Sequence, residues 1–536
     1  MQNTPVAFIS FQEQDNLGIG YIASVLLQNG FKIKIIDVRL GREKVLEEIR
    51  RLDPRVVGFS LIFQYHLYDF AELINYLRAN GVAAHFCIGG HYPSLRHDEI
   101  LSVIPQIDSV ALFEGEYTFL ELVKAISRGE EWRGIHGIAY RNNASNMVNP
   151  LRPLEKDLDN FPPPVRYPVR QSVLGKKIAT IMAGRGCVFD CSFCSIREFY
   201  SKPPGPAKRV RRPEMVAREI ELLYNEMGCS IFMFQDDDFP VAKKTGSEWT
   251  KRFCEELREK GLHDKIMWKI SCRCDEIKPS IFHVMKDSGL SLVYLGIESG
   301  TDSGLRLMNK RLTAETNVRA VNMLKELGIN YEYGFMLFDP TTTYESVQEN
   351  LDFLKKICGD GSAPLTFCKM IPYAGTPIER ELKKEGRLKV MRPGYADYDF
   401  IDSSIDDLYM AASECFNEWI GRQDGVTNLG KWANFHLSVY RKYFQPDVHA
   451  DGLTEAAARA ISESNLYAVD TLKTLADLIC SGRRVSQGRV STIKDEAAVK
   501  HAEFQARLMG VINDVRSRHD EPPPARPSWC CNSWAT

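Results

Sequence analysis

The chain has 536 residues, of which 44% are hydrophobic and 26% are charged, and its formal net charge is −2. This length suits about three domains of an ordinary globular composition. A general nucleic-acid binder is disfavoured, because such proteins carry a basic face. No apolar run approaches the length of a membrane span. The 14 cysteines, without a signal-peptide pattern at Met1–Ser10, indicate a reducing, cytoplasmic location rather than a disulfide framework.

The first 145 residues alternate short apolar strands with amphipathic helices. Strands are expected at 6–10, 32–37, 56–60, 85–90 and 109–116, and helices follow the first, third and fifth of them. This α/β alternation predicts a doubly wound, Rossmann-like parallel sheet, whose ligand binds beyond the carboxyl ends of the strands. The residues expected there are Ser60, Gly89, Gly90, His91, Glu114, Gly115 and Glu116.

The rest of the chain divides by composition. Residues 146–178 are predicted to be a linker, because DLDNFPPP at 157–164 is acidic and then proline-rich. Residues 179–390 contain six expected strands with intervening helices, which predicts a partial (β/α)6 barrel with its chemistry at the carboxyl ends of the strands. Residues 391–518 have helical patterns and no chemical motif, and 519–536 are expected to be a disordered tail. Cys530 and Cys531 lie in that tail and suit either an unstructured end or a metal or partner site.

One short stretch, GRGCVFDCSFC from Gly184 to Cys194, carries the strongest chemical signal. Cys187, Cys191 and Cys194 have CxxxCxxC spacing after an expected strand. Thiolates are soft ligands for iron–sulfur clusters and zinc, and three ligands leave one metal position open. The alternatives are three buried free cysteines or half of a zinc site. Structural zinc usually takes ligands from two knuckles, and no second CxxC is present, although Cys272 and Cys274 form a CxC pair.

The loop resembles the CxxxCxΦC signature of the radical S-adenosylmethionine (SAM) enzymes, in which Φ is aromatic. The resemblance implies that the three cysteines hold a [4Fe–4S] cluster and that SAM chelates its fourth iron. It also implies reductive cleavage of SAM to a 5′-deoxyadenosyl radical, with electrons from an external donor such as flavodoxin or ferredoxin.

The resemblance extends to the residues expected to bind SAM. Phe193 would lie beside the cluster, Asp236 and Asp237 near the methionyl amino group, and Arg273 against a carboxylate. Glu298 and Ser299, in GIESG, would bind the ribose or the amino-acid end. Pro372 and Tyr373, in PYAGTP, match the turn that carries the adenine edge. FDPTTTYE replaces the more usual GxPGET-like turn, which leaves the roles of Leu337–Thr343 open.

The first domain resembles the cobalamin-binding domain that precedes one branch of these enzymes. The resemblance implies cobalamin contacts at Leu17, Gly18, Ser60, Gly89, Gly90, His91, Glu114 and Gly115. The DxHxxG loop of cobalamin-dependent methionine synthase is absent, and the first loop, QEQDNLG, offers no histidine to cobalt. The alternative is a flavodoxin-like or receiver-like domain without a cofactor. No phosphate-binding GxGxxG follows the first strand.

The resemblance therefore implies a cobalamin-dependent radical SAM methyltransferase of the class B type. The expected reaction moves a methyl group from SAM through methylcobalamin to an unactivated carbon of a natural-product-type small molecule or a peptide. Two alternatives stay open: a cyclase or rearrangement enzyme without net methylation, and a non-catalytic cobalamin or redox sensor. A methylthiotransferase is disfavoured, because its extra cluster needs three cysteines in the first domain, where only Cys87 occurs.

Overall fold

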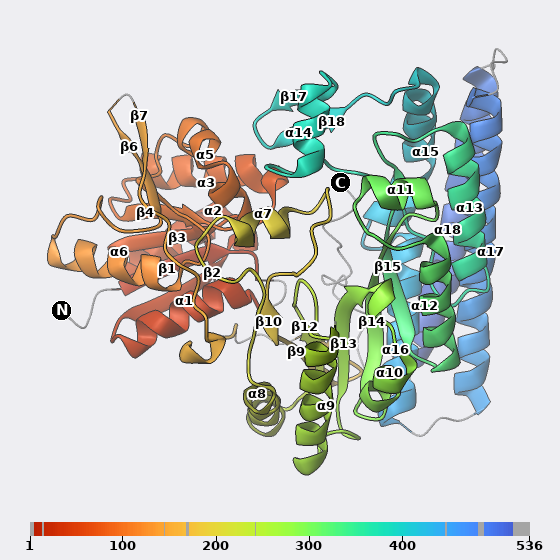
Figure 1. Cartoon of the computed structure of the whole chain (residues 1–536), viewed down its shortest axis with the longest axis horizontal. Coiled ribbons are helices and arrows are strands. Elements are labelled where there is room, and N and C mark those ends of the chain that lie inside the picture. Colours follow the sequence, from red (N-terminus) through yellow and green to blue (C-terminus); the bar gives the residue numbers. More distant parts are fainter. Residues whose placement is uncertain are drawn as a thin grey trace. The chain divides into compact units, whose positions relative to one another are not determined.

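The computed structural model describes residues 5–12, 15–143, 145–167, 171–241, 243–444, 448–480 and 487–517. Helices and strands carry the labels of Figure 1. The chain divides into two compact units. Unit 1 comprises Met1–Arg170, Thr180–Met215 and Ile371–Asp397, and unit 2 comprises Gln171–Ala179, Val216–Met370 and Tyr398–Thr536. Each unit is described by itself.

Unit 1 is built on a seven-stranded sheet of order β2-β1-β3-β4-β5-β6-β7. Its strands are β1 (Pro5–Ser10), β2 (Lys32–Asp37), β3 (Val56–Ser60), β4 (His85–Gly89), β5 (Ser109–Ala111), β6 (Ile138–Asn142) and β7 (Ser145–Val148). Its helices are α1 (Leu17–Gln28), α2 (Arg42–Leu52), α3 (Leu67–Ala79), α4 (His91–Leu95), α5 (His97–Val103) and α6 (Glu116–Arg128), with 3-10 turns at Val38–Leu40, Gln64–His66 and Leu158–Asn160. Strands β1 to β5 pair in parallel, which confirms the doubly wound sheet.

The sheet of unit 1 has one extension that the strand pattern did not predict. Strands β6 and β7 form an antiparallel hairpin, and β6 pairs antiparallel with β5. Asn143 in the turn between them has φ of +52°, a left-handed conformation that asparagine tolerates better than most residues. The hairpin therefore carries the sheet into the segment predicted as a linker, where β7, β8 (Ser172–Val173) and the first residues of β9 (Lys176–Ile181) also fall.

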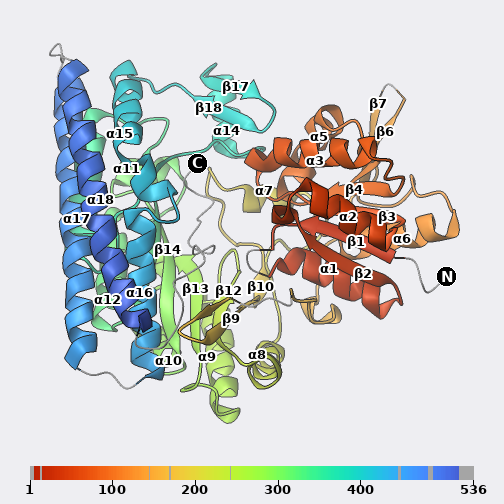
Figure 2. The same cartoon turned by 180° about the vertical axis from the view of Figure 1, so that it is seen from behind.

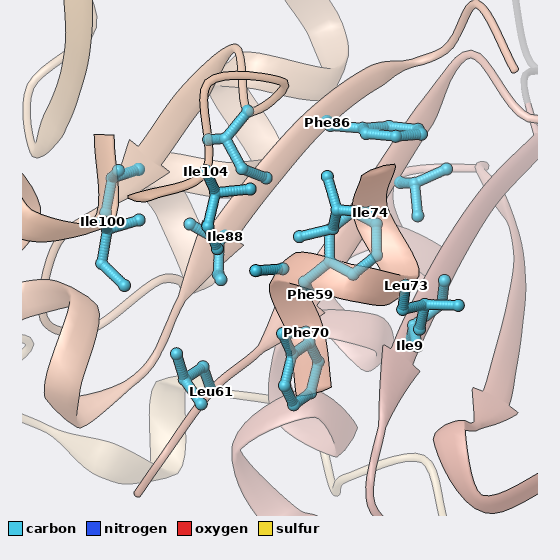
Figure 3. Close-up of a cluster of buried hydrophobic side chains, with 14 of the residues drawn as sticks. Ile9, Phe59, Leu61, Phe70, Leu73, Ile74, Phe86, Ile88, Ile100 and Ile104 are labelled. Atoms are coloured by element: carbon cyan, nitrogen blue, oxygen red, sulfur yellow. The ribbon is translucent and has the colours of Figure 1, made fainter. Parts of the chain in front are cut away.

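Alternating side chains along the strands give unit 1 two cores. Ala7 and Ile9 point into a cluster with α3 and α5, in which Phe70 and Ile74 pack against Phe59 of β3 (Figure 3). The other face of the same strands packs against α1 and α6. Because successive strand residues point to opposite faces, helices cover both sides of the sheet.

Unit 1 also holds the segment around the three cysteines. This segment contains β10 (Gly184–Arg185), α7 (Ser195–Ser201) and β11 (Arg209–Val210), and β10 pairs antiparallel with β11. The later part of unit 1 contains α14 (Pro377–Lys384), β17 (Leu388–Arg392) and most of β18 (Tyr395–Tyr398).

Unit 2 contains most of a second sheet, of order β16-β15-β14-β13-β12-β9-β8. The remaining strands are β12 (Cys229–Phe234), β13 (Met267–Arg273), β14 (Leu290–Glu298), β15 (Asn330–Phe338) and β16 (Cys368–Lys369). The helices between them are α8 (Pro213–Met227), α9 (Lys243–Glu259), α10 (Pro279–Lys286), α11 (Asp302–Leu307), α12 (Ala314–Glu326) and α13 (Tyr344–Cys358), with a 3-10 turn η4 at Cys274–Glu276. All six strands expected for the partial barrel occur, and β12 to β16 pair in parallel.

A cluster of aromatic rings packs on the outer face of this sheet. Trp268 of β13 packs edge-on against Phe234 of β12 and Phe253 of α9. Since Trp268 points outward, its neighbours Lys269, Ser271 and Arg273 point to the inner face of the barrel. The inner face is therefore the one that carries polar groups.

The C-terminal part of unit 2 is helical, as predicted. It contains α15 (Ser403–Gly421), α16 (Val426–Tyr443), α17 (Val448–Cys480) and α18 (Gln487–Ser517), and α16, α17 and α18 pack against one another (Figures 1 and 2). The predicted tail, with Cys530 and Cys531, lies outside the described residues. Among the helices that the structure describes, none combines the length and the apolar character needed to cross a bilayer.

Candidate functional site

The three cysteines of unit 1 lie on one partly exposed loop. Cys187, Cys191 and Cys194 are each neither fully buried nor fully exposed, and the Cys194 amide donates a hydrogen bond to the Cys191 carbonyl at 3.3 Å. Gly186 has φ of +77°, and a Cβ there would lie 1.8 Å from the Ala207 carbonyl oxygen. Only glycine fits this position, so the sequence GRGC is what lets the loop curl directly before Cys187.

The donor set suits an iron–sulfur cluster. Burial raises the thiol pKa of Cys87, Cys254, Cys274, Cys358 and Cys368 to about 12, which leaves those thiols protonated and inert. Among the described residues, no three His, Cys, Asp or Glu side chains converge as the ligands of a single metal ion do. A cubane cluster requires a different arrangement, because each thiolate binds a different iron and the sulfurs are spread around the cluster. Three accessible thiols on one short loop meet that requirement.

The PYAGTP turn packs against the cysteine loop within unit 1. The Ile378 amide donates to the carbonyl of Ser192, which lies between Cys191 and Phe193, at 3.0 Å. Thr376 caps α14, and its hydroxyl also donates to the Tyr373 carbonyl at 2.7 Å. Three residues expected to bind SAM, Phe193, Pro372 and Tyr373, therefore come from two segments that are far apart in sequence and adjacent in this unit.

The expected cobalamin residues gather at one edge of the first sheet. In the order 2-1-3-4-5 the switch point lies between β1 and β3, and Ser60 ends β3 there. Gly89, Gly90 and His91 follow on the neighbouring strand β4 and are partly exposed. Gly90 has φ of +121°, and a Cβ there would lie 2.2 Å from the Leu61 carbonyl oxygen. Packing against Leu61 therefore requires glycine at position 90, and cobalamin binding at this edge stays a prediction.

Leu17 and Gly18 begin α1 beside the same switch point. Asn16 caps this helix by accepting a hydrogen bond from the Ile19 amide at 3.1 Å. Leu17 is buried, whereas Gly18 is exposed. The preceding residue, Asp15, forms a buried ion pair with Arg166 at 2.9 Å, which fixes the end of this first loop.

The carboxylate of Glu114 belongs to a buried network of ion pairs. Its carboxylate accepts hydrogen bonds from Arg185 at 3.0 Å and from Arg209 at 2.7 Å. Arg185 also donates to Glu116 at 2.6 Å. Although burial opposes ionisation, the two arginines hold the pKa of Glu114 below its ordinary value. The β5–α6 turn with Gly115 is thereby fastened to β10 and β11, the two paired strands that flank the cysteine segment.

In unit 2, the expected SAM residues lie at the carboxyl ends of the strands. Asp236 is buried and Asp237 is exposed directly after β12. Arg273 ends β13, and its guanidinium donates to both carboxylate oxygens of Asp275, at 2.9 and 3.2 Å, and to the Lys310 carbonyl. Its charge is therefore already matched by a carboxylate in this conformation.

Glu298 and Ser299 end β14 in an unusual backbone conformation. Glu298 has φ of +66°, a strained value for a residue with a side chain, and such strain is common at functional sites. Its carboxylate lies 3.5 Å from the buried Lys310 ammonium, and burial raises its pKa. The Ser299 hydroxyl is fully buried and bonds to Asn350 at 3.3 Å, so it stabilises the GIESG turn.

Other polar residues of unit 2 did not stand out in the sequence. Glu276, in η4, is buried near Asp238, and burial together with the Asp238 charge raises its pKa to about 9. Lys310 pairs with Glu298 across 12 residues, in a loop with no motif of its own. Lys269 and Ser271 alternate with Arg273 in KISCR, a period-two pattern that could have revealed a polar inner face.

Two family models match successive parts of this chain. The B12 binding domain matches residues 9–123, and the radical SAM superfamily matches residues 181–354. An uncharacterized methyltransferase of Pyrococcus horikoshii is 30% identical over 371 residues, which cover 68% of this chain and 77% of that protein. The chain belongs to the cobalamin-dependent radical SAM enzymes. Its cofactors are accordingly a [4Fe–4S] cluster, SAM and cobalamin.

Another relative of this radical SAM enzyme is named as a cyclase. The anaerobic magnesium-protoporphyrin IX monomethyl ester cyclase of Cereibacter sphaeroides is 27% identical over 424 residues, which cover 76% of this chain and 65% of the cyclase. The present chain thus spans less than two thirds of the length of that cyclase.

Solved structures share the fold. The cobalamin-dependent SAM radical enzyme OxsB, with aqua-cobalamin and SAM bound, aligns with a TM-score of 0.67 at 17% identity, covering 94% of this chain and 84% of OxsB. The radical SAM methyltransferase TsrM from Kitasatospora setae, with tryptophan substrate and a SAM analogue bound, aligns with a TM-score of 0.64 at 15% identity, covering 96% of this chain and 99% of TsrM. At such identities the likeness establishes the fold and not the substrate.

Proposed function

We propose that this radical SAM enzyme is a C-methyltransferase that modifies an unactivated carbon of a small molecule or peptide. When bound, the reduced cluster with SAM supplies a radical that removes hydrogen from such a carbon, and methylcobalamin supplies the methyl group. The protein's part is to hold both cofactors and the substrate in register and to exclude water.

One observation carries the proposal: a relative at 30% identity over most of its length is named as an uncharacterized methyltransferase. The arrangement of unit 1 is consistent with it. The cysteine loop and the strand ends expected to hold the corrin belong to the same compact unit, joined by the ion pairs of Arg185 and Arg209 with Glu114. Such an arrangement suits a reaction in which both cofactors act on one substrate carbon.

The second candidate is a radical cyclase without net methylation. It is supported by the Cereibacter cyclase, at 27% identity. The two candidates differ in the product, because methyl transfer adds a carbon and cyclisation does not.

The deciding experiment uses the full chain reconstituted anaerobically with iron, sulfide and cobalamin. Substrate pools are incubated with a flavodoxin or ferredoxin reducing system and with SAM that carries a deuterated methyl group. A methyltransferase gives a product that contains the labelled methyl group, together with 5′-deoxyadenosine. A product without the label supports the cyclase. Absence of 5′-deoxyadenosine from a protein with a full cluster would favour a sensor and refute both.

A matched control omits cobalamin but keeps the cluster. Under the proposal this preparation still cleaves SAM and yields no methylated product. Labelled product without cobalamin would mean that the methyl group moves directly from SAM, which would contradict the proposed route.

A further inference from the structure

The inner face of the unit 2 sheet carries charged groups below the strand ends. Ser271 of β13, Tyr294 of β14 and Glu332 of β15 are register partners on three neighbouring strands, so their side chains lie in one row. Lys269 lies two residues before Ser271, with its ammonium 3.4 Å from the Ser271 hydroxyl and 5.5 Å from the centre of the Tyr294 ring. Barrel interiors of this kind are usually filled with branched aliphatic side chains.

Helix α16 lies against the amino-terminal ends of the same strands. Asn330, the first residue of β15, donates to Ser438 of α16 at 2.6 Å, and Tyr443 at the end of α16 donates to the Ser230 carbonyl of β12 at 2.7 Å. From this helix Lys431, only 6% exposed, brings a second ammonium close enough to Lys269 to lower its pKa, after the larger effect of burial. Helix α16 therefore brings the Lys431 ammonium near Lys269 on the inner face of the sheet.

The charges of this row are not balanced. At the strand ends above it, Arg273 pairs with Asp275 and Lys310 pairs with Glu298. Beside the row, the ammonium groups of Lys269 and Lys431 face a single carboxylate, that of Glu332. Within the described part of the chain, the side chains of Glu332 and Lys431 make no hydrogen bond and no ion pair within 4.0 Å. A buried lysine without a partner destabilises a fold, so its presence points to a ligand that supplies the missing charge.

Apolar side chains lie on both sides of this row and suit the apolar part of a ligand. Met233, which pairs in register with Lys269, and Met336 and Phe338 of β15 share the inner face and are buried. Gly334 lets the Tyr294 side chain lie across this face, because a Cβ at Gly334 would lie only 2.8 Å from the Tyr294 hydroxyl. At a rise of about 3.3 Å per residue, Lys269 lies roughly 13 Å along β13 from Arg273. A ligand that reaches both levels is an extended molecule.

We infer that Lys269 and Lys431 bind the anionic end of the substrate, whose apolar or aromatic body extends along the inner face toward the strand ends. One excess positive charge matches a carboxylate, and a phosphate ester shares the same chemistry. The inference deepens the proposed function and rests on it only in taking the barrel interior as the substrate side.

The test measures binding to the reconstituted full chain by calorimetry, without SAM or reductant. The probes are 3-phenylpropionate, phenyl phosphate and the neutral 3-phenylpropionamide. We expect at least one anion to bind about tenfold or more tightly than the amide. Preference for the carboxylate or for the phosphate identifies the source of the anion. Equal binding of all three probes, or no measurable binding of either anion at millimolar concentration, would overturn the inference.

Variants separate a binding role from a structural one. Lys431→Met and Lys269→Met should each abolish the preference for the anion, whereas Lys442→Met, an exposed position on the same helix, should keep it. Without ligand, Lys431→Met should raise the melting temperature, since it removes an unpartnered buried charge. A lower melting temperature for Lys431→Met than for Lys442→Met would assign Lys431 to the fold and refute the inference. These readouts do not depend on methyl transfer, so they stand apart from any failure of the proposed reaction.

Discussion

The rings of His91 and Phe199 stack face to face, with centroids 4.2 Å apart and planes inclined by only 6°. His91 directly follows Gly90 at the end of β4, and Phe199 lies in α7, five residues after Cys194. Phe113 packs edge-on against the same Phe199 ring at 5.2 Å. The strand ends of the first sheet and the helix after the cysteines are thus joined by aromatic contacts within one unit.

His91→Ala should lower the free energy of unfolding by about 1 kcal/mol, because it removes a stacked pair. His91→Phe keeps a flat ring and should restore most of that loss. Thermal unfolding of both variants checks this, with cobalamin content measured in parallel. If both variants lose the same stability relative to the wild type, an imidazole nitrogen of His91, and not the ring stack, stabilises the fold. If only cobalamin content falls, His91 acts on the ligand rather than on α7.

Replacing Cys187, Cys191 and Cys194 together by alanine should remove the bound iron and abolish 5′-deoxyadenosine formation. Thiolates are the only protein ligands expected for the cluster, so no other side chain can compensate. Iron and sulfide analysis with electron paramagnetic resonance provides the measurement. Cys480→Ala, a partly exposed cysteine outside the loop, is the matched control and should keep full iron content. Retention of iron by the triple variant would contradict the cluster assignment.

Local sequence pattern predicted the strands of the first sheet closely. The segments 32–37 and 56–60 became strands with those bounds, because short apolar runs between turn residues have few alternatives. The last of the six strands expected in 179–390 is much shorter than the others, since β16 comprises only Cys368–Lys369 before the segment Leu365–Ile378 turns into α14. Pro372 and Pro377 in that segment lack the amide that a strand needs, so the chain forms a turn and a helix instead.

Long-range charge pairing could not be predicted from the sequence. The carboxylate of Glu114, a predicted cobalamin contact, bonds to Arg185 and Arg209, residues 71 and 95 positions away. Nothing in the spacing of the two arginines indicates a partner so distant. The cysteine loop was recognisable because its ligands are close in sequence, whereas the balance of charges at the strand ends appears only once the strands are aligned.

Gly90→Ala should destabilise unit 1 more than Gly81→Ala does. Both glycines have positive φ, +121° at Gly90 and +82° at Gly81, so both variants carry backbone strain. At Gly81 the added Cβ meets nothing within 4 Å, whereas at Gly90 it would lie 2.2 Å from the Leu61 carbonyl oxygen. We expect about 1 kcal/mol for Gly81→Ala and about 3 kcal/mol or more for Gly90→Ala, measured by thermal unfolding. Equal losses would show that the strand ends can move apart, which would weaken the case for a rigid corrin-binding edge.

Glu276→Gln should stabilise the protein, and the gain should grow with pH. Burial first, and the charge of Asp238 next, raise the pKa of Glu276 from its ordinary 4.5 to about 9. Between these values the native state holds a proton that the unfolded state releases, so the wild type loses stability as pH rises through this window. A glutamine is neutral at every pH and can still accept the Arg273 amide hydrogen bond, which Glu276 accepts at 2.8 Å.

Melting temperatures of Glu276→Gln and the wild type at several pH values between 6 and 9 measure this gain. We expect the variant to be about 1–2 kcal/mol more stable near pH 8, with a smaller difference near pH 6. Glu349→Gln, at an exposed position of α13, should follow the wild type throughout. A difference that stays constant between pH 6 and 9 would mean that Glu276 is already ionised in the folded protein, because a carboxyl with an ordinary or lowered pKa no longer titrates in this window.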